Sequence, residues 1–481
     1  MTRPGVVVAV QTSVPPRSIP TDTGVAFIAG QCDKGATNAP TLVQSLDQFI
    51  SLCGARVTYS ILYDAVDIFF REGGNAAYIG RVVGPSAIAA SHTFNDAGAV
   101  SSLVLSADSP GAWGNNIKVG IVAGQVTGYA IQVQDMSNNI LETSYDLVTQ
   151  ADALSWVNTY SQYLNCVLGT STNPPAQVAA VALAGGADDR NNITDAQWLA
   201  ALNTFGPALG PGQVLAPGRT STAGTQQVCA HAQANNRVAL VDLVDTPTVA
   251  TLQSGASAAA ASGAGQYSAA FTPWLVVPGA TPGTSRIVPP SCAIAGLIAR
   301  NDVLNNPDTP AAGEQGIFNS VIGLSQPAWV DSVRQTLNAS GVNVIRGMIG
   351  GFRNYGYRSL ANPVSNQAWL DFSNVRYLMG LGARCQAVGE MFVFAVIDGQ
   401  GNTFSDYGAA LSALCQADYS SGQIYGGTPE EAFNVDTGPG VNTPATIADN
   451  QLRAVVAVRP SPFAELVSIL IVNTPITQQV A

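Results

Sequence analysis

The sequence predicts a multidomain α/β protein (α+β over the whole chain) in which a β-rich segment interrupts the α/β part. Three observations predict this class. Residues 21–85 contain a strand, two helical segments and a second strand. Short alternating runs separated by Ser-, Asn- and Gly-rich turns fill residues 86–185, and strands alternate with helices again in residues 186–335. A chain of 481 residues has room for about two to four domains.

The first α/β segment begins with an apolar run at residues 24–30 (GVAFIAG), which is typical of a buried strand. Residues 45–49 and 65–70 have helical spacing, and a pair of glycines ends the second helix. Residues 77–83 (AYIGRVV) form the next strand. A strand–helix–strand unit of this kind favours parallel pairing of its strands.

The β-rich segment contains alternating runs at residues 116–122 and 129–133, and we expect a helix at residues 151–164 to end it. The α/β pattern then resumes. We expect a helix at 195–205 with Trp198, Leu199 and Leu202 on one face, a strand at 238–242, a helix at 256–264, a strand at 274–277 and a helix at 291–300.

Residues 336–458 predict a C-terminal α+β unit. We expect strands at 342–346, 357–360 and 453–458, and helices at 371–385 and 406–416. The glycine-rich residues 347–353 (GMIGGFR) lack the strand-to-helix context of a dinucleotide site, so we interpret them as a backbone bend or crossing.

Both ends of the chain carry an apolar, strand-like run next to a proline-bearing spacer. The runs are Val6, Val7, Val8, Ala9 and Val10 at one end, and Leu466, Val467, Ser468, Ile469, Leu470, Ile471 and Val472 at the other. An apolar edge strand invites pairing with another chain. Each run either adds a strand to a neighbour's sheet or pairs within its own chain, and the pattern alone does not choose.

The composition is poor in charge, and this excludes some partners. Charged residues make up 11% of the chain and the net charge is −11, with Lys34 and Lys118 as the only lysines. An acidic chain without a basic run has no footprint for nucleic acid, and low surface charge promotes self-association. We expect no signal peptide and no transmembrane segment. The seven scattered cysteines fit free thiols made in a reducing cytoplasm.

Catalytic chemistry has few candidate residues. A Ser/His/Asp hydrolase needs a histidine base, and only His92 and His231 are available, without a GxSxG motif. Cys229 is two positions from His231, which on a helix directs the two side chains apart. We therefore expect no catalytic residue.

Metal and cofactor sites are also not expected. Asp188-Asp189 and Glu430-Glu431 are the tight acidic pairs, but neither has a His or Cys nearby. The first pair follows glycines and fits a turn, whereas the second follows Thr428-Pro429 and fits an ordinary helix start. No phosphate-binding P-loop occurs.

Several short motifs, in order along the chain, resemble the contractile-tail sheath proteins. They are residues 4–6 (PGV), 19–29 (IPTDTGVAFIA), 77–82 (AYIGRV), 109–117 (SPGAWGNNI), 183–189 (LAGGADD), 289–296 (PPSCAIAG), 341–346 (GVNVIR), 356–360 (GYRSL) and 427–433 (GTPEEAF). Residues 376–389 depart from the family because they carry less charge, which bears on the contacts with the tube.

The resemblance implies a sheath domain of subtilisin-like topology without proteolytic activity. Its implied parts are the sheath domain (21–85 and 186–335), an inserted β-rich domain (86–185), a C-terminal α+β sheath domain (336–458) and strand-donating arms (1–20 and 459–481). It also implies that the arms pair with neighbouring copies through the sheet of the C-terminal domain, which favours strand donation.

The implied function is that of a structural tail sheath. Copies form hexameric rings stacked as a helix around the inner tube, and contraction drives the tube through the bacterial envelope for genome ejection. The implied partners are further copies, the tail tube protein, and the baseplate and tail terminator proteins. The implied location is the tail of a virion made in the host cytoplasm. The alternatives are the sheath of a phage-derived bacteriocin or other injection system, a subtilisin-like hydrolase, and a surface-layer protein, which would normally carry a secretion signal.

Overall fold

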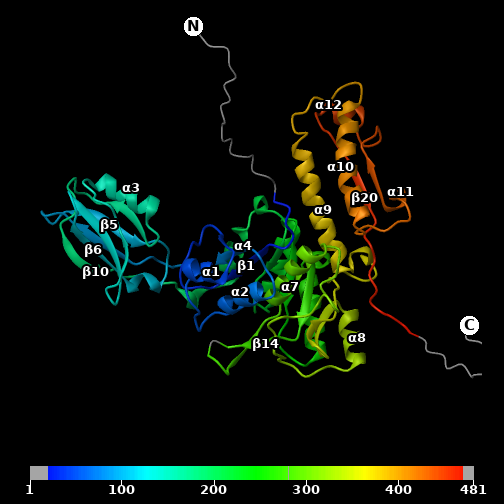
Figure 1. Ribbon diagram of the computed structural model, residues 1–481, viewed down its shortest axis with the longest axis horizontal. Helices are drawn as coiled ribbons and strands as arrows, with labels where there is room; N and C mark the ends of the chain where they lie inside the picture. Colours follow the sequence, from blue (N-terminus) through cyan, green and yellow to red (C-terminus); the bar gives the residue numbers. More distant parts are fainter. Residues whose placement is uncertain (1–19, 280, 470–481) are drawn as a thin grey trace, which may run out of the picture.

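The computed structural model describes residues 20–279 and 281–469, and within them the largest sheet has eight strands (Figure 1). In spatial order the strands are β18 (Gly351–Asn354), β17 (Val342–Met348), β13 (Ser268–Thr272), β12 (Val238–Asp242), β11 (Gln213–Leu215), β1 (Ala26–Gly30), β3 (Ala77–Arg81) and β2 (Thr41–Val43). The inner six are parallel, and β2 and β18 are antiparallel edge strands. The predicted parallel pairing of β1 with β3 is confirmed, with Ala26 opposite Ala77.

Helices cover both faces of this sheet. One face packs α1 (Leu46–Cys53), α2 (Leu62–Arg71) and α7 (Ser291–Leu304), and the other packs α4 (Asp195–Asn203), α5 (Thr222–Ala234), α6 (Val249–Ala260) and α8 (Asp331–Ala339). Successive side chains of β1 alternate between the layers, because Ala26 and Ile28 join one core and Phe27 joins the other. The strands are therefore buried on both sides, as in other parallel sheets.

Two predicted helices of this part differ in detail. Leu202 of α4 is buried as expected, but Leu199 is 41% exposed. The residue after Trp198 lies about 100° round the helix and so leaves the buried face. The predicted helix at 256–264 begins seven residues earlier, at Val249, and ends at Ala260, shortly before Gly263 with φ +82°.

The β-rich segment forms two sheets and one helix with a core of their own, at one end of the molecule in Figure 1. One sheet contains β4 (Ser91–Asn95), β5 (Ser101–Ala107) and β9 (Leu164–Leu168); the other contains β10 (Val178–Ala182), β6 (Ile117–Ala123), β7 (Tyr129–Asp135) and β8 (Ile140–Thr143). The prediction that the helix ends this segment was wrong. The helix, α3 (Gln150–Tyr160), ends at Tyr160, and the hydroxyl of the next residue, Ser161, accepts a hydrogen bond from the amide of Leu164. Strands β9 and β10 follow the helix.

The chain enters and leaves the β-rich segment side by side. The amide of Gly84 donates to the carbonyl of Asp188 at 2.9 Å, and the amide of Ser86 donates to the Asp189 carboxylate at 2.8 Å. The Asp188 carboxylate pairs with Arg190 at 3.0 and 2.5 Å. The acidic pair thus holds together the two chain segments that lead into and out of the β-rich segment, which we call the neck. This agrees with its predicted turn role.

The large sheet continues past residue 335, where the sequence places a domain boundary, because β17 pairs with β13. The glycine-rich segment forms the turn and second strand of a hairpin, with Gly350 at φ +94°. The predicted strand at 357–360 was wrong. The Asn343 side chain bonds both the amide and the carbonyl of Arg358, at 2.7 and 2.8 Å, and so takes the place of a strand partner.

The remaining described strands and helices are not part of the large sheet, although several of them pack against one of its cores. A small sheet contains β14 (Leu275–Pro278), β15 (Ser285–Val288) and β16 (Gly323–Leu324). The C-terminal part contains α9 (Phe372–Glu390), α10 (Asn402–Ser420), α11 (Pro429–Ala432), β19 (Phe433–Asp436), α12 (Pro444–Ala448) and β20 (Val455–Val458). In Figure 1, α9 and α10 rise from the α/β layers as an upright pair with β20 beside them. No helix of the described chain has the length and apolarity needed to span a bilayer.

Candidate assembly site

The C-terminal part of the described chain contains a two-stranded antiparallel sheet, formed by β19 and β20. Phe433 lies opposite Val458, and Val435 opposite Val456. These four side chains are half-buried, whereas the alternate residues of both strands are exposed. Among residues 20–279 and 281–469, no third strand joins this sheet. A two-stranded sheet is marginal by itself, and its free edges carry unpaired backbone groups.

Helices α9 and α10 support this sheet through a small apolar core. Tyr377, Leu381, Ile424 and Ala432 are buried there, and Phe433 packs against them. The Thr428-Pro429 helix start is confirmed in α11, which leads directly into β19. One face of the sheet is therefore fixed on a rigid platform while its edges stay open.

The Asp418 carboxylate on α10 fixes this platform to α9. It accepts two hydrogen bonds from Arg384, at 2.7 and 2.8 Å, and one from the Tyr377 hydroxyl at 2.9 Å. Asp418 is 2% exposed. Burial and this carboxylate raise the pKa of Tyr377 above its usual range, so the hydroxyl stays a donor.

A second buried ion pair joins α9 to the α/β layers. The Arg376 guanidinium, fully buried, contacts Asp302 of α7 at 2.9 and 2.5 Å. The Thr23 hydroxyl donates to the same carboxylate at 2.7 Å. Arg376 is the first residue of the segment 376–389, which the family resemblance associates with the tube. Its charge is nevertheless neutralised by Asp302 of the same subunit.

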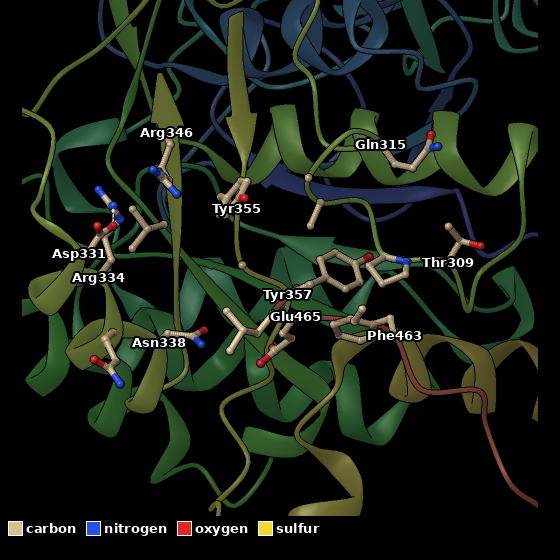
Figure 2. A pocket seen from close by; sticks show the side chains of 18 residues that line it. Thr309, Gln315, Asp331, Arg334, Asn338, Arg346, Tyr355, Tyr357, Phe463 and Glu465 are labelled. Carbon is tan, nitrogen blue, oxygen red and sulfur yellow. Dashed lines mark ion pairs between the residues drawn. The ribbon is translucent and has the colours of Figure 1, made fainter. Parts of the chain in front are cut away.

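The segment after β20 runs back towards the large sheet. The amide of Ser461 donates to the carbonyl of Gln423 at 3.0 Å, and Arg358 holds the Glu465 carboxylate at 3.0 and 2.5 Å. Phe463 and Glu465 lie with Tyr357 at the edge of a cavity of about 620 Å³, which Figure 2 shows. The start of the segment is thus attached to its own subunit.

The cavity beside this segment is lined by side chains of both signs. Arg334 pairs with Asp331, and the Arg346 guanidinium lies 4.6 Å from the ring centre of Tyr355 (Figure 2). Gln315 and Thr309 line the opposite side of the cavity.

The predicted C-terminal strand lies partly within the described residues. Leu466, Val467 and Ile469 are 83%, 74% and 81% exposed, and Ser468 is exposed as well. None of the four is in a strand. Leu470, Ile471 and Val472, and the N-terminal run Val6, Val7, Val8, Ala9 and Val10, lie outside the described residues.

An exposed apolar loop that the sequence analysis does not single out joins α9 to α10. Met391, Val393, Phe394 and Val396 are 69%, 56%, 99% and 81% exposed. Phe394 has φ +63°, a left-handed conformation that is strained for a residue with a bulky side chain. The strain and the exposure were not visible in the sequence, because each depends on how the loop leaves α9.

Comparison with solved structures finds this arrangement in sheath proteins. The sheath tail protein Lin1278 from Listeria innocua matches with a TM-score of 0.62 and 14% identity, over 88% of this chain and 90% of that one. The helical sheath of the anti-feeding prophage in its contracted state matches with 0.57 and 17%, over 98% and 99%. The contracted PVC sheath complex, from an extracellular contractile injection system, matches with 0.56 and 14%, over 98% of both chains.

The chain has the fold of a contractile tail sheath protein. The sheath fold extends over nearly the whole chain, so the predicted resemblance is confirmed at the level of the fold. No family model matches the sequence, and no curated protein was found as a relative.

Within this sheath fold, the histidines take structural positions. His231 of α5 contacts Asn235 and Arg237, and burial together with the Arg237 charge lowers its pKa to about 4. His92 lies in β4 and stacks edge-on with Phe94. Neither ring hydrogen bonds a serine or cysteine side chain within the described residues.

A Ser–Asp pair does occur at the carboxyl end of the large sheet. The Ser291 hydroxyl at the start of α7 donates to Asp242 at 2.7 Å, and the amides of Ser291 and Gly218 donate to the same carboxylate. Burial raises the pKa of Asp242 to about 6. Both side chains are fully enclosed, so this pair stabilises the strand-to-helix connection. No cluster of three metal-ligating side chains is found in residues 20–279 and 281–469.

Proposed function

We propose that this chain is the structural subunit of a contractile tail sheath, whose copies polymerise by completing each other's β19–β20 sheets. The observation that carries the proposal is the two-stranded sheet with open edges in a chain whose two ends are apolar. We assign Val6–Val10 and Leu466–Val472 as the donated strands, as β-augmentation requires an extended segment with alternating side chains.

Strand donation would supply both backbone and side-chain contacts. Each added backbone hydrogen bond contributes about 1 kcal/mol. The donated apolar side chains would cover Val456 and Val458, which the two-stranded sheet leaves half-buried. An arm of five to seven residues would therefore join neighbouring copies with several kcal/mol.

We propose the assembly that follows from such links. Hexameric rings stack as a helix around an inner tail tube, between a baseplate and a tail terminator protein. The large sheet with its helix layers acts as the rigid sheath domain, for which we propose a subtilisin-like topology without catalysis. The β-rich segment is its insertion, and the part from α9 onward acts as the linking domain.

Contraction requires two arrangements of the same rigid subunits. The extended lattice must be metastable, and contraction must increase the contact between subunits. A gain of only a few kcal/mol per subunit is sufficient, because it multiplies over many copies. The arms keep neighbours connected while the rigid parts slide.

Two settings fit this function. In a phage, contraction drives the tube through the bacterial envelope for genome ejection, and the sheath is part of the virion. In a bacteriocin or another injection system, the same sheath delivers a different cargo. The second setting is favoured by the likeness to the anti-feeding prophage and to an extracellular contractile injection system. Capsid genes beside the sheath gene would decide for the phage.

Electron microscopy of the purified chain tests the proposal. We expect long hollow cylinders from the full-length chain, and folded monomers from chains lacking residues 1–12 or 464–481. Cylinders of normal length from either truncation would contradict strand donation. Labelling of the intact chain by a serine-directed covalent probe would instead support the subtilisin-like hydrolase.

A further inference from the structure

Two of the seven cysteines belong to the same buried core, beside the carboxyl end of β1. Cys32 follows β1 by two residues, and Cys53 is the last residue of α1. The Cys32 thiol donates to the carbonyl of Lys34 at 3.3 Å, and a Cβ on Gly35 would lie 3.8 Å from the Cys53 sulfur. Cys32 is 6% exposed and Cys53 is 1% exposed. The sequence shows no such pair, because 20 residues separate the two cysteines.

Main-chain contacts pack residues 33–35 closely against residues 52–54. The amide of Lys34 donates to the carbonyl of Cys53 at 3.2 Å. Gly35 has φ +111°, and a Cβ there would lie 3.1 Å from the carbonyl oxygen of Leu52. A Cβ at Gly54 would lie 2.8 Å from the Cβ of Asp33. Such contact keeps both cysteines close, and a disulfide needs Cα atoms within about 4.4–6.8 Å.

Two cations lie near the pair. The neighbouring Cys32 thiol and burial raise the pKa of Cys53 above its usual range, while the charges of Arg81 and Lys34 act in the opposite direction. The Arg81 guanidinium donates to the carbonyls of Cys32 and Asp33, at 3.1 and 2.7 Å. These two charges offset part of the cost of forming a thiolate at Cys53.

We propose that Cys32 and Cys53 are a dithiol that closes into a disulfide by exchange with a small-molecule disulfide such as oxidised glutathione. The Cys32 thiolate attacks one glutathione sulfur and releases the first reduced glutathione. The Cys53 thiolate then attacks the Cys32 sulfur of this mixed disulfide and releases the second. Two cysteines are oxidised, one glutathione disulfide is reduced to two thiols, and the cysteine protons pass to the leaving thiolates.

The new bond would stiffen the seam between the large sheet and the β-rich segment. The amide of Gly35 donates to the Ser109 hydroxyl at 2.9 Å, and the Lys34 ammonium lies 5.9 Å from the ring centre of Trp113. Both partners belong to the β-rich segment. The inference goes beyond the proposed function and does not rest on it.

The other five cysteines provide an internal comparison. Cys385 of α9 lies near enough to Cys415 of α10 to help raise the pKa of the Cys415 thiol, but no hydrogen bond joins the two side chains. Cys166, Cys229 and Cys292 are buried in three different cores. We therefore expect oxidation to be confined to the Cys32–Cys53 pair.

The test treats the full-length chain with oxidised glutathione, alkylates the remaining thiols and maps the peptides by mass spectrometry. We expect two of the seven thiols to be lost, a cross-link between the Cys32 and Cys53 peptides, and its reversal by excess reduced glutathione. The Cys32→Ser variant should form no cross-link, whereas Cys166→Ser should form it normally.

Three results would overturn the proposal: seven unmodified thiols, a lasting glutathione adduct on Cys32 in the wild-type chain, or a cross-link confined to Cys385 and Cys415. If Cys32→Ser does not fold, the wild-type peptide map still decides.

Discussion

At the scale of single residues, Asp418 is the side chain on which the platform under the β19–β20 sheet depends. Asp418→Asn would leave Arg384 without its carboxylate partner and weaken the bond from Tyr377. We expect the free energy of unfolding to fall by about 3 kcal/mol, as is usual when a buried charge loses its partner. Urea denaturation of the monomer measures this. The control is Asp449→Asn at an exposed position, and equal stability of the two variants would argue against the network.

Asp308 predicts a dependence of stability on pH. Burial, together with the charges of Asp371 and Asp418, raises its pKa to about 7. Between about pH 4 and pH 7 the Asp308 carboxyl therefore holds a proton in the folded chain but releases it in the unfolded chain. The free energy of unfolding accordingly falls as the pH rises through this range.

Asp308→Asn should accordingly stabilise the chain at pH 8 but not at pH 4. One pKa unit corresponds to about 1.4 kcal/mol, so we expect a gain of roughly 1 to 3 kcal/mol at pH 8. Denaturation curves at both pH values measure it, with the exposed Asp47→Asn as the control. A gain of equal size at both pH values would show that the carboxyl does not titrate in this way.

Variants at Phe394 can distinguish an effect on stability from an effect on assembly, because the ring is exposed and the backbone is strained. We expect Phe394→Gly to leave the monomer as stable as wild type, or about 1 kcal/mol more stable, since glycine tolerates positive φ. Phe394→Ala removes the ring but keeps the strain. We expect both variants to sediment less as polymer. Normal polymer from both would remove this loop from the assembly surface.

At the scale of elements, the C-terminal segment is where charge should be least tolerated. Val467→Lys places a cation in a strand that we propose to lie in a neighbour's sheet. We expect loss of sedimentable polymer with an unchanged melting temperature of the monomer, because Val467 is 74% exposed in the isolated chain. The control is Val126→Lys, at a 92% exposed valine in the β-rich segment. Loss of polymer in both variants would mean that surface charge in general, rather than the arm, controls assembly.

The elements that the sequence predicts well are those with strong apolar periodicity. The runs that became β1, β3 and β12, and the helix that became α7, are found within a few residues of their expected positions. In contrast, β11 has only three residues and β13 reads SAAFT, so neither has a pattern that distinguishes it from a loop.

The candidate site could be predicted only in part. The apolar ends follow from composition, and β20 was expected, but its partner β19 reads FNVD and carries no strand signal. Residues 357–360 do not form a strand, because the Asn343 side chain binds the backbone of Arg358. This contact joins residues that are distant in the sequence, so no local pattern reveals it. The same is true of the exposed Phe394, whose conformation depends on tertiary packing.

At the scale of the whole molecule, two ion pairs connect the C-terminal helices with the α/β layers. Arg376–Asp302 fixes α9 to the α/β layers, and Asp418 fixes α10 to α9. The neck at Asp188-Asp189 fastens the β-rich segment. A contracting lattice requires subunits that keep their shape while their mutual arrangement changes.

The most direct test is a cryo-electron microscopy map of the assembled polymer, at a resolution that traces the chain through the β19–β20 sheet. We predict a sheet of at least four strands in which Val6–Val10 and Leu466–Val472 come from adjacent copies. A map in which both ends return to the sheet of their own subunit would contradict it.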